Sequence, residues 1–242
     1  MTVLILAAGY GTRMYPLTEN TPKALLPIGE GSILAFLMEK IKGLAPQRVV
    51  LVSNHRYAEA FRSWLSARSF PFPCEVLDDG STSDADRLGS IGDIVFSIRE
   101  GKIQDDLMVL GSDNLFDADL ADFHRFAAGT GEITLAAYAL PDRFQAHRYG
   151  VLSADPDGRI TAFVEKPADP PSNLVSTAIY FFPRAALPRV LEYLSSSRSS
   201  DTIGSLISWL IAHGRVYAHP FRGRWFDIGD SASYEAAKKS WD

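Results

Sequence analysis

The stretch Val3–Pro27, VLILAAGYGTRMYPLTENTPKALLP, decides how the rest of the chain can be interpreted. It begins with an apolar run, residues 3–8, which is typical of a strand buried on both faces of a parallel sheet. The loop that follows contains Gly9 and Gly11, whose missing side chains let backbone N–H groups approach a polyphosphate closely. The stretch therefore predicts a buried strand that leads into an anion-binding loop.

Two cations, Arg13 and Lys23, make this loop more specific than a glycine turn alone. A dinucleotide-binding fingerprint would need a third glycine where Met14 stands, and an acidic residue about 20 positions further on. A P-loop would need Gly-Lys-Ser/Thr at the start of a helix, but Lys23 follows Pro22. Neither of these phosphate-binding motifs is present, so the loop is of another kind.

Composition limits the class of protein. The chain has 242 residues and 46% hydrophobic content, which is enough for one sizeable core. A net charge of −5 argues against nucleic acid as the main partner. Cys74 is the single cysteine, so no internal disulfide can form. No apolar stretch approaches the roughly 18 residues of a membrane span, and no targeting signal is recognised, so we expect a cytoplasmic enzyme that has no contact with a membrane.

Strand and helix patterns alternate in the first half of the chain, which indicates a mostly parallel sheet. From Glu132 onward longer β segments dominate. The sequence predicts strands at residues 3–8, 48–53, 75–77, 107–110, 133–139, 150–153, 160–164, 175–182 and 215–221. It predicts helices at residues 32–44, 57–68, 184–194, 202–212 and 232–239, and a surface connection at residues 195–200.

Five motifs in this order resemble the sugar-1-phosphate nucleotidyltransferase family. They are residues 9–27 (GYGTRMYPLTENTPKALLP), 111–114 (GSDN), 149–151 (YGV), 165–167 (EKP) and 225–229 (WFDIG). The resemblance implies an α/β fold with a Rossmann-like, mostly parallel mixed sheet flanked by helices and a β-rich sugar-binding insertion. It also implies a single domain over residues 1–242, with a nucleotide-binding part at about residues 1–130 and a sugar-binding part at about 131–230.

The same resemblance assigns roles on the nucleotide side. Asp113 corresponds to the family's metal-binding aspartate, and with Asp227 it would hold Mg²⁺, which typically takes one or two carboxylates together with substrate phosphates. Arg13 and Lys23 would act as catalytic cations that neutralise phosphate charge. The expected nucleotide-binding residues are Ala8, Gly9, Gly11, Thr12, Gly89 and Asp93.

On the acceptor side, the resemblance implies that Lys166 pairs with the phosphate of the sugar and that Glu165 accepts hydrogen bonds from its hydroxyl groups. Gly150 is expected to leave room for the sugar against the backbone. Ala178 departs from the family, because relatives with Val-Thr-Gly carry glycine there. The remaining candidates for a polar lining are Asn173, Thr177 and Tyr180.

The predicted reaction is attack of a sugar 1-phosphate oxygen on the α-phosphorus of a nucleoside triphosphate, with release of pyrophosphate. Family frequency favours glucose 1-phosphate with dTTP or UTP. Residues 89–93 (GSIGD) stand where many relatives carry a base-reading glutamine, so the base stays open. Cytidylyl or guanylyl transfer to mannose 1-phosphate or a phosphocholine-like acceptor is one alternative. A non-catalytic regulatory subunit that binds nucleotide sugars is another, and the sequence leaves a homo-oligomer open.

Overall fold

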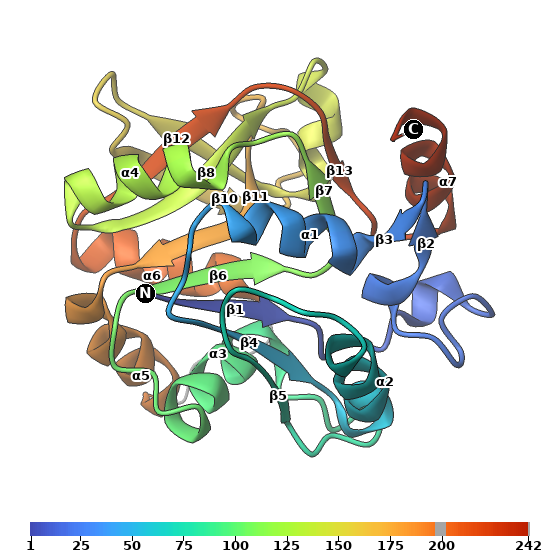
Figure 1. The fold of residues 1–242 in the computed structure, drawn as a ribbon. Coiled ribbons are helices and arrows are strands. Elements are labelled where there is room, and N and C mark those ends of the chain that lie inside the picture. Colours follow the sequence, from blue (N-terminus) through green and yellow to red (C-terminus); the bar gives the residue numbers. More distant parts are fainter. Residues whose placement is uncertain (197–201, 242) are drawn as a thin grey trace.

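The structure is a computed structural model that describes residues 1–196 and 202–241. Within these residues, nine strands form one mixed sheet in the order β10-β9-β11-β6-β1-β4-β5, and β8 joins β11 while β12 joins β8 (Figure 1). The strands of this sheet are β1 Thr2–Leu6, β4 Arg48–Ser53, β5 Cys74–Asp78, β6 Leu107–Gly111, β8 Ile133–Ala139, β9 Gly150–Ala154, β10 Ile160–Glu165, β11 Leu174–Phe182 and β12 Val216–Phe221.

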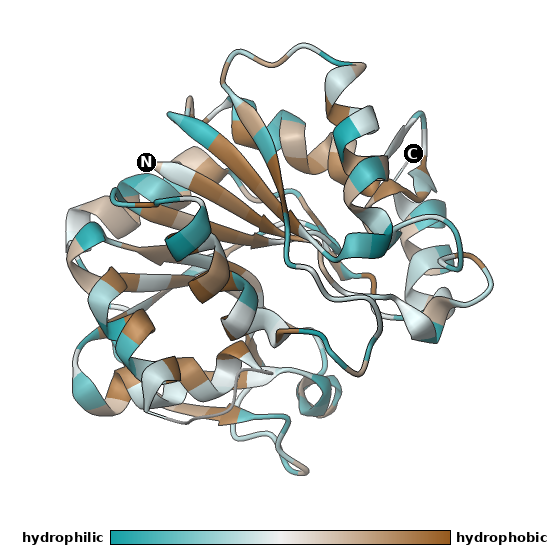
Figure 2. Ribbon diagram, turned by 90° about the horizontal axis from the view of Figure 1, so that it is seen from below, coloured by the Kyte–Doolittle hydropathy of each residue, from teal (hydrophilic) through white to brown (hydrophobic). Residues whose placement is uncertain are grey.

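Helices cover both faces of the sheet. The described α-helices are α1 Ile33–Lys42, α2 His55–Ser66, α3 Gly89–Glu100, α4 Leu120–Thr130, α5 Leu187–Ser195, α6 Ile203–His213 and α7 Ser231–Ser240. Apolar residues of α1, α2 and α4 pack on one face, and those of α3, α5 and α6 pack on the other. Figure 2 shows the resulting apolar strands enclosed between helices whose outer surfaces are more polar.

The N-terminal strand β1 lies in the middle of the parallel part of the sheet, between β4 and β6. Its residues alternate between the two cores: Leu4 faces α3, whereas Val3 and Ile5 face α1. All three side chains are fully buried, and each such burial contributes roughly 1.5–3 kcal/mol relative to an exposed side chain. The strand predicted at residues 3–8 therefore exists, although the ladder ends at Leu6.

The second half of the chain supplies the antiparallel part of the sheet. Strand β11 runs antiparallel to β6, and β9 pairs antiparallel with β10. The register of β11 against β8 shifts between Ser176 and Tyr180, which marks a bulge. The expected α/β fold with a mostly parallel mixed sheet and a β-rich insertion is thus confirmed.

Two short ladders lie outside the main sheet. Strand β7 (Asn114–Phe116) pairs antiparallel with β13 (Trp225–Asp227), and β2 (Pro27–Ile28) pairs with β3 (Gly31–Ser32). The C-terminal helix α7 packs against the loop that follows β1, because Tyr234 and Ala237 share a small apolar core with Met14. The last helix of the chain therefore contacts its N-terminal segment.

Several element boundaries differ from the expectations. Helix α2 begins at His55, because the side chain of Asn54 caps it by accepting a hydrogen bond from Tyr57 N. The helix predicted at residues 184–194 is divided into a 3₁₀ turn, Arg184–Ala186, and α5, because Pro188 fits only in the first turn of an α-helix. Residues 197–200 of the predicted surface connection lie outside the described residues.

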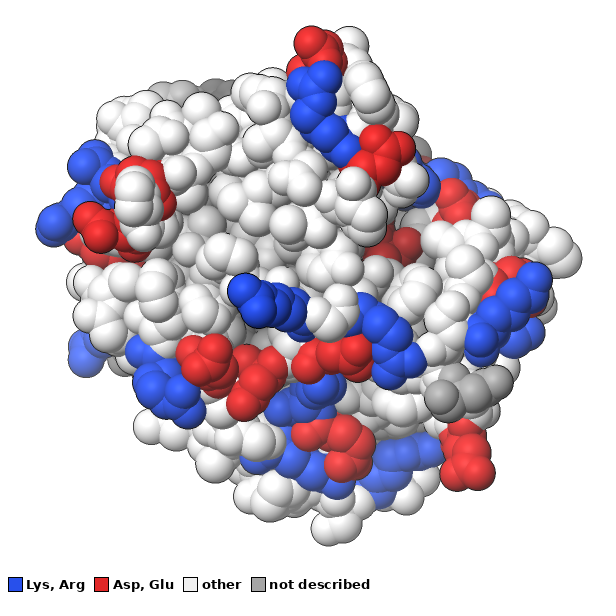
Figure 3. Space-filling view, turned by 90° about the horizontal axis from the view of Figure 1, so that it is seen from above, with Lys and Arg blue, Asp and Glu red and all other residues white. Residues whose placement is uncertain are grey.

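Two surface properties complete the description. No helix among the described residues is long and apolar enough to cross a membrane. On the face shown in Figure 3, acidic and basic side chains are interspersed, and the basic ones do not merge into one continuous surface. That face therefore lacks the electrostatic footprint of a nucleic-acid-binding surface.

Candidate active site

A cavity of about 640 Å³ opens at the carboxyl ends of β1 and β6. Its wall combines segments from both halves of the chain, as expected for a ligand site at this edge of an α/β sheet. The predicted site residues that line it are Ala8, Gly9, Arg13, Lys23, Gly89, Asp93, Asp113, Gly150, Glu165, Lys166, Thr177, Tyr180 and Asp227. Three other candidates, Gly11, Thr12 and Asn173, are not among the residues that line this cavity.

The ladder between β7 and β13 brings the two candidate metal ligands together. Asp113 directly precedes β7, and Asp227 at the end of β13 lies opposite Asn114. The backbone N–H of Ile228 donates to the carbonyl of Asp113 over 2.9 Å. Both carboxylates are therefore held by paired backbone rather than by flexible loops.

The two carboxylates differ in their partners, because Lys23 forms an ion pair with Asp113. Lys23 Nζ donates to Asp113 Oδ2 over 2.6 Å. Burial opposes ionisation of Asp113, but the Lys23 ammonium group outweighs it and holds the pKa of Asp113 below its usual range. For Asp227, burial and the negative charge of Asp113 raise the pKa to about 6. This incompletely neutralised pair of carboxylates suits a divalent cation.

The donor set also fits magnesium. Within residues 1–196 and 202–241, no group of three or more His, Cys, Asp or Glu side chains could hold a metal. A cation held by Asp113 and Asp227 would therefore complete its coordination with water and substrate oxygens, which is the usual arrangement for Mg²⁺.

The glycine loop owes its shape to Gly11 rather than to Gly9. Gly11 has φ +63°, and a Cβ there would lie 3.2 Å from the fully buried side chain of Thr18. Thr18 Oγ1 donates to Gly11 O over 2.7 Å and fixes the turn. Arg13 follows and reaches towards Gly229, so its guanidinium group lies beside the Asp227 segment. Gly11 and Thr12 thus shape the turn that presents Arg13.

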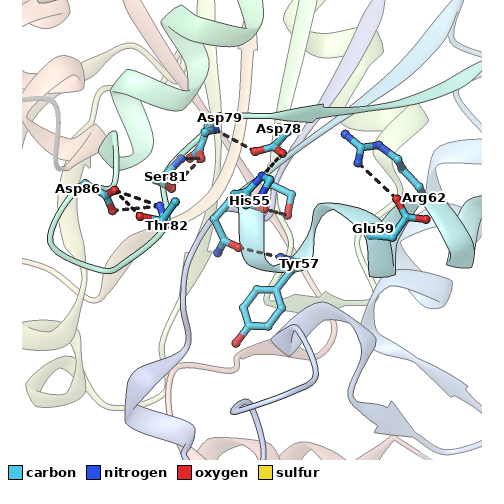
Figure 4. Close-up of polar contacts among 12 residues, drawn as sticks. His55, Tyr57, Glu59, Arg62, Asp78, Asp79, Ser81, Thr82 and Asp86 are labelled. Atoms are coloured by element: carbon cyan, nitrogen blue, oxygen red, sulfur yellow. Dashed lines mark hydrogen bonds and ion pairs between the residues drawn. The ribbon is translucent and has the colours of Figure 1, made fainter.

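A second loop, residues 79–88, reaches the cavity between β5 and α3 and is organised by its own carboxylates (Figure 4). Asp86 accepts hydrogen bonds from the backbone and side chain of both Thr82 and Ser83, and these bonds lower its pKa. Asp79 likewise accepts from the backbone and hydroxyl of Ser81. The loop is therefore held in one shape before any ligand arrives.

Asp93 lies at the junction of this loop and the cavity. It is 6% exposed and sits in α3, one turn after Gly89. Burial and, to a smaller extent, the nearby Asp79 carboxylate raise the pKa of Asp93 to about 8. The surroundings of Asp93 therefore favour its protonated form.

The acceptor side of the cavity is closely packed. The Phe163 ring occupies the space of a side chain at Gly150, where a Cβ would lie 2.3 Å from Cζ. Gly150 therefore makes room for Phe163, and because Gly150 also lines the cavity, its contact with a sugar stays a prediction. In the same way, Glu165 Oε2 would lie 2.0 Å from a Cβ at Gly204 in the first turn of α6. Burial raises the pKa of Glu165, while Lys166 Nζ lies 3.9 Å from its carboxylate.

The remaining acceptor-side candidates divide into two groups. Tyr180 lines the cavity, and its hydroxyl lies 3.1 Å from that of Ser176. Thr177 also borders the cavity, but its hydroxyl donates to Ala136 O over 2.9 Å. The amide of Asn173 donates to Leu140 O over 2.7 Å, which makes it a strand-end contact outside the cavity.

Sequence reasoning missed several cavity residues. Arg148, Tyr149 and Trp225 line the cavity, and the rings of Tyr149 and Trp225 lie 5.1 Å apart. The sequence contains a signal for two of them, because Tyr149 stands in the YGV motif and Trp225 in the WFDIG motif. Gly204 lies in none of the five motifs, and it is adjacent to Glu165 only in the folded protein.

Comparisons with known proteins identify the family to which the chain is similar. The family described as "Nucleotidyl transferase" matches residues 2–241. A UTP--glucose-1-phosphate uridylyltransferase from Synechocystis sp. is 30% identical over 244 residues, covering 97% of this chain and 61% of the relative. A uridylyltransferase from Haloferax volcanii, AglF, is 29% identical, covering 95% of this chain and 91% of its own. The chain thus spans about three fifths of the Synechocystis relative's length.

Solved structures show the same fold. A Bacillus anthracis protein assigned as a glucose-1-phosphate thymidylyltransferase superposes with a TM-score of 0.84 at 23% identity, covering 99% of this chain and 94% of the other. A UDP-glucose pyrophosphorylase complexed with UDP-glucose gives 0.82 at 20% identity, with coverage of 99% and 97%. At these identities the similarity establishes the architecture alone.

Proposed function

The chain belongs to the nucleotidyl transferase family, and from this premise we propose that it joins a nucleoside triphosphate to a sugar 1-phosphate and releases pyrophosphate. One observation carries the proposal. A single cavity is lined by the glycine loop with its two cations, by the paired aspartates and by the Glu165-Lys166 motif from the other half of the chain. These are the groups needed to hold two anionic substrates against each other.

The catalytic problem is repulsion between the substrates. The attacking phosphate oxygen is already ionised near pH 7, so no general base is required. Arg13 would hold phosphate oxygens through its planar fork and stabilise the departing pyrophosphate, and Lys23 would supply a compact positive charge nearby. Asp113 and Asp227 would hold Mg²⁺, which when bound neutralises the phosphate charge that develops during transfer.

The acceptor would lie against the other wall. Lys166 would pair with the phosphate of the sugar, and Glu165 would accept hydrogen bonds from its hydroxyl groups. Glu165 is already held against Gly204, so little conformational entropy would be lost when a sugar binds. Gly89 and Asp93, on the opposite wall, would contact the nucleotide.

Two of the relatives support a finer assignment. The Synechocystis and Haloferax proteins are described as UTP--glucose-1-phosphate uridylyltransferases. We therefore take UTP or dTTP as the donor and glucose 1-phosphate as the acceptor.

The decisive experiment is an assay of pyrophosphate release over a matrix of five nucleoside triphosphates and several sugar 1-phosphates. We expect release only when a triphosphate, a sugar 1-phosphate and Mg²⁺ are all present, with UTP or dTTP and glucose 1-phosphate as the best pair. Formation of the sugar nucleotide should match pyrophosphate one to one. Pyrophosphate release that does not depend on the sugar phosphate would exclude the proposal. So would a lack of pyrophosphate release with every pair of substrates.

One observation supports a second acceptor class. The rings of Tyr149, Phe163 and Trp225 line the cavity together with the carboxylate of Glu165, and aromatic faces with a carboxylate can bind a quaternary amine. Phosphocholine belongs in the acceptor panel for this reason. A higher kcat/KM with CTP and phosphocholine than with any sugar 1-phosphate would identify this alternative.

A further inference from the structure

Two hydrogen bonds connect an aromatic wall of the cavity to Asp113, and a third holds Asp113 from the side of Lys23. Trp225 Nε1 donates to Asn114 Oδ1 over 2.8 Å, and Asn114 Nδ2 donates to Asp113 Oδ1 over 2.9 Å. Lys23 Nζ donates to the other carboxylate oxygen, Oδ2, over 2.6 Å. Each oxygen of Asp113 therefore has its own partner, and one of these partners is itself held by the indole.

The donor and acceptor atoms in this series of hydrogen bonds follow from the chemistry of the indole. An indole N–H can only donate, so the Asn114 atom that faces Trp225 must be the carbonyl oxygen. The amide nitrogen is then obliged to face Asp113. A flipped amide would place a carbonyl oxygen against the carboxylate and leave the indole N–H without an acceptor. Trp225 and the Asp113 carboxylate thus select the same orientation of Asn114.

The surroundings keep this arrangement in place. Asn114 is 3% exposed, so water cannot easily replace either of its partners. The Trp225 ring packs 5.1 Å from Tyr149 and 5.5 Å from Tyr138. The β7–β13 ladder aligns the backbones, with Asn114 opposite Asp227 and Phe116 opposite Trp225.

We propose that Trp225 and Asn114 are positioning residues: the indole orients the amide, and the amide orients the Asp113 carboxylate towards the divalent cation. The inference rests on the proposed function, in which Asp113 is a metal ligand. The amide occupies Oδ1 and leaves Oδ2, now paired with Lys23, as the oxygen for the cation. Because Trp225 also lines the cavity, one side chain contributes to the acceptor wall and sets the geometry of the metal ligand.

The effect of removing the indole N–H can be estimated from comparable metal sites. Groups that orient a metal ligand typically change metal affinity about 10- to 100-fold when they are removed. Trp225→Phe keeps an aromatic ring in the wall but cannot donate, so we expect Mn²⁺ affinity to fall by about 10-fold. Asn114→Ala removes the direct contact to Asp113 and should cause a loss at least as large.

The test is a double-mutant cycle on Mn²⁺ binding, measured by electron paramagnetic resonance with a non-hydrolysable triphosphate analogue present. The variants are Trp225→Phe, Asn114→Ala and the double variant, with Trp241→Phe as a matched control because Trp241 lies outside the cavity. If Trp225 acts through Asn114, the double variant should bind Mn²⁺ no more weakly than Asn114→Ala alone. The thermal midpoints of all variants identify any that fail to fold, and either single variant that folds still tests the link to Asp113.

The outcomes separate this inference from the proposed function. Mn²⁺ affinities of folded Trp225→Phe or Asn114→Ala within two-fold of the parent, or fully multiplicative losses in the double variant, would overturn the positioning roles while leaving the metal site intact. A parent chain that binds no Mn²⁺ with or without nucleotide would instead overturn the metal site itself, and this inference with it.

Discussion

The two walls of the cavity reach the left-handed backbone region in different ways. On the nucleotide side the residues with positive φ are glycines: Gly89, at +76°, lines the cavity, and Gly11, at +63°, lies in the turn that presents Arg13. On the acceptor wall they are Lys166 at +45° and Ala178 at +56°, which carry side chains. A left-handed conformation costs about 1–2 kcal/mol for a residue with a Cβ and almost nothing for glycine.

The difference indicates where the fold retains strain. The nucleotide wall needs only backbone N–H groups at its tight turns, and glycine supplies them without strain. At Lys166, by contrast, the side chain is a proposed phosphate ligand, so the backbone must accept an unfavourable conformation to present it. Strain that persists at a site wall is typical of functional positions.

The largest expected effect comes from the aspartates between the two walls. Asp113→Asn should lower kcat by at least about 100-fold, because the charge stabilisation supplied by a metal is worth several kcal/mol. Pyrophosphate release at saturating substrates measures the loss, and circular dichroism shows whether the fold is retained. Such a loss would show that turnover requires the carboxylate of Asp113 between the two walls.

The matched control for that variant is Asp119→Asn. Asp119 caps α4 by accepting from Ala121 N and does not line the cavity. Asparagine caps equally well, so turnover should be unchanged. Near-normal kcat in Asp113→Asn at modest Mg²⁺ would contradict the metal assignment.

A second prediction concerns pH and the buried carboxyl group of Asp93 on the nucleotide wall. The pKa of Asp93 is raised to about 8, above its ordinary value near 4 in the unfolded chain. The contribution of this group to stability is therefore fully present below about pH 4 and is lost as pH rises towards 8, by at most about 1.4 kcal/mol per pH unit. Asp93→Asn carries no titrating group at this position, so its Tm relative to the parent should rise from pH 5 to pH 9.

Asp86→Asn provides a control of opposite sign in the same loop. Its pKa is lowered by backbone N–H groups of Thr82 and Ser83, so its stabilising contribution is present at neutral pH and is lost in acid. The Asp86→Asn variant should accordingly be less stable than the parent at pH 7 and approach it as pH falls. Parallel pH profiles for the parent and Asp93→Asn would show that Asp93 is ionised at neutral pH.

The next two predictions test the contrast between the walls directly. Gly11→Ala should destabilise the protein by about 1–2 kcal/mol, lowering Tm by roughly 2–8 °C. The alanine would have to adopt the left-handed backbone conformation of Gly11, and its Cβ would crowd the side chain of Thr18. Gly9→Ala is the matched control, since no atom lies within 4 Å of its Cβ position. Equal Tm values for the two variants would remove the distinction between these glycines.

Ala178→Gly should have the smallest effect, and one of opposite sign. Relief of the left-handed strain, reduced by the greater freedom of glycine in the unfolded chain, should stabilise the protein by about 0.5–1 kcal/mol. Ala162→Gly in β10, which is exposed and has no positive φ, should instead lose about 0.5–1 kcal/mol. A lower Tm for Ala178→Gly would mean that contacts of its methyl group outweigh the strain.

Most of the elements could be predicted because their signals are local. The apolar run before Gly9 can only be a buried strand, and residues 48–53 and 133–139 are strands with the predicted limits. Helix α3 is not among the predicted helices, because Gly89 and Gly92 lower the helical propensity of its first turn. Burial of Ile91, Ile94 and Ile98 against the sheet outweighs that propensity.

The geometry of the candidate site could be predicted only in part. The motifs contain many of the residues that line the cavity but neither Arg148 nor Gly204, and no local pattern contains the pairing of β7 with β13. Phe163 over Gly150 and Glu165 over Gly204 are likewise contacts between distant segments. Such contacts depend on how the two halves pack, and a single sequence does not encode that in its spacing.

The β7–β13 ladder also has a consequence for synthesis of the chain on the ribosome. The hydrogen bond between Trp225 and Asn114 spans 111 positions, so β7 leaves the exit tunnel long before its partner is translated. During that interval the nascent protein has its glycine loop but an unpaired β7 edge, which is the kind of surface that chaperones protect. A chain that stalls before residue 225 would therefore fold its central strands and still lack both the partner strand and the second aspartate.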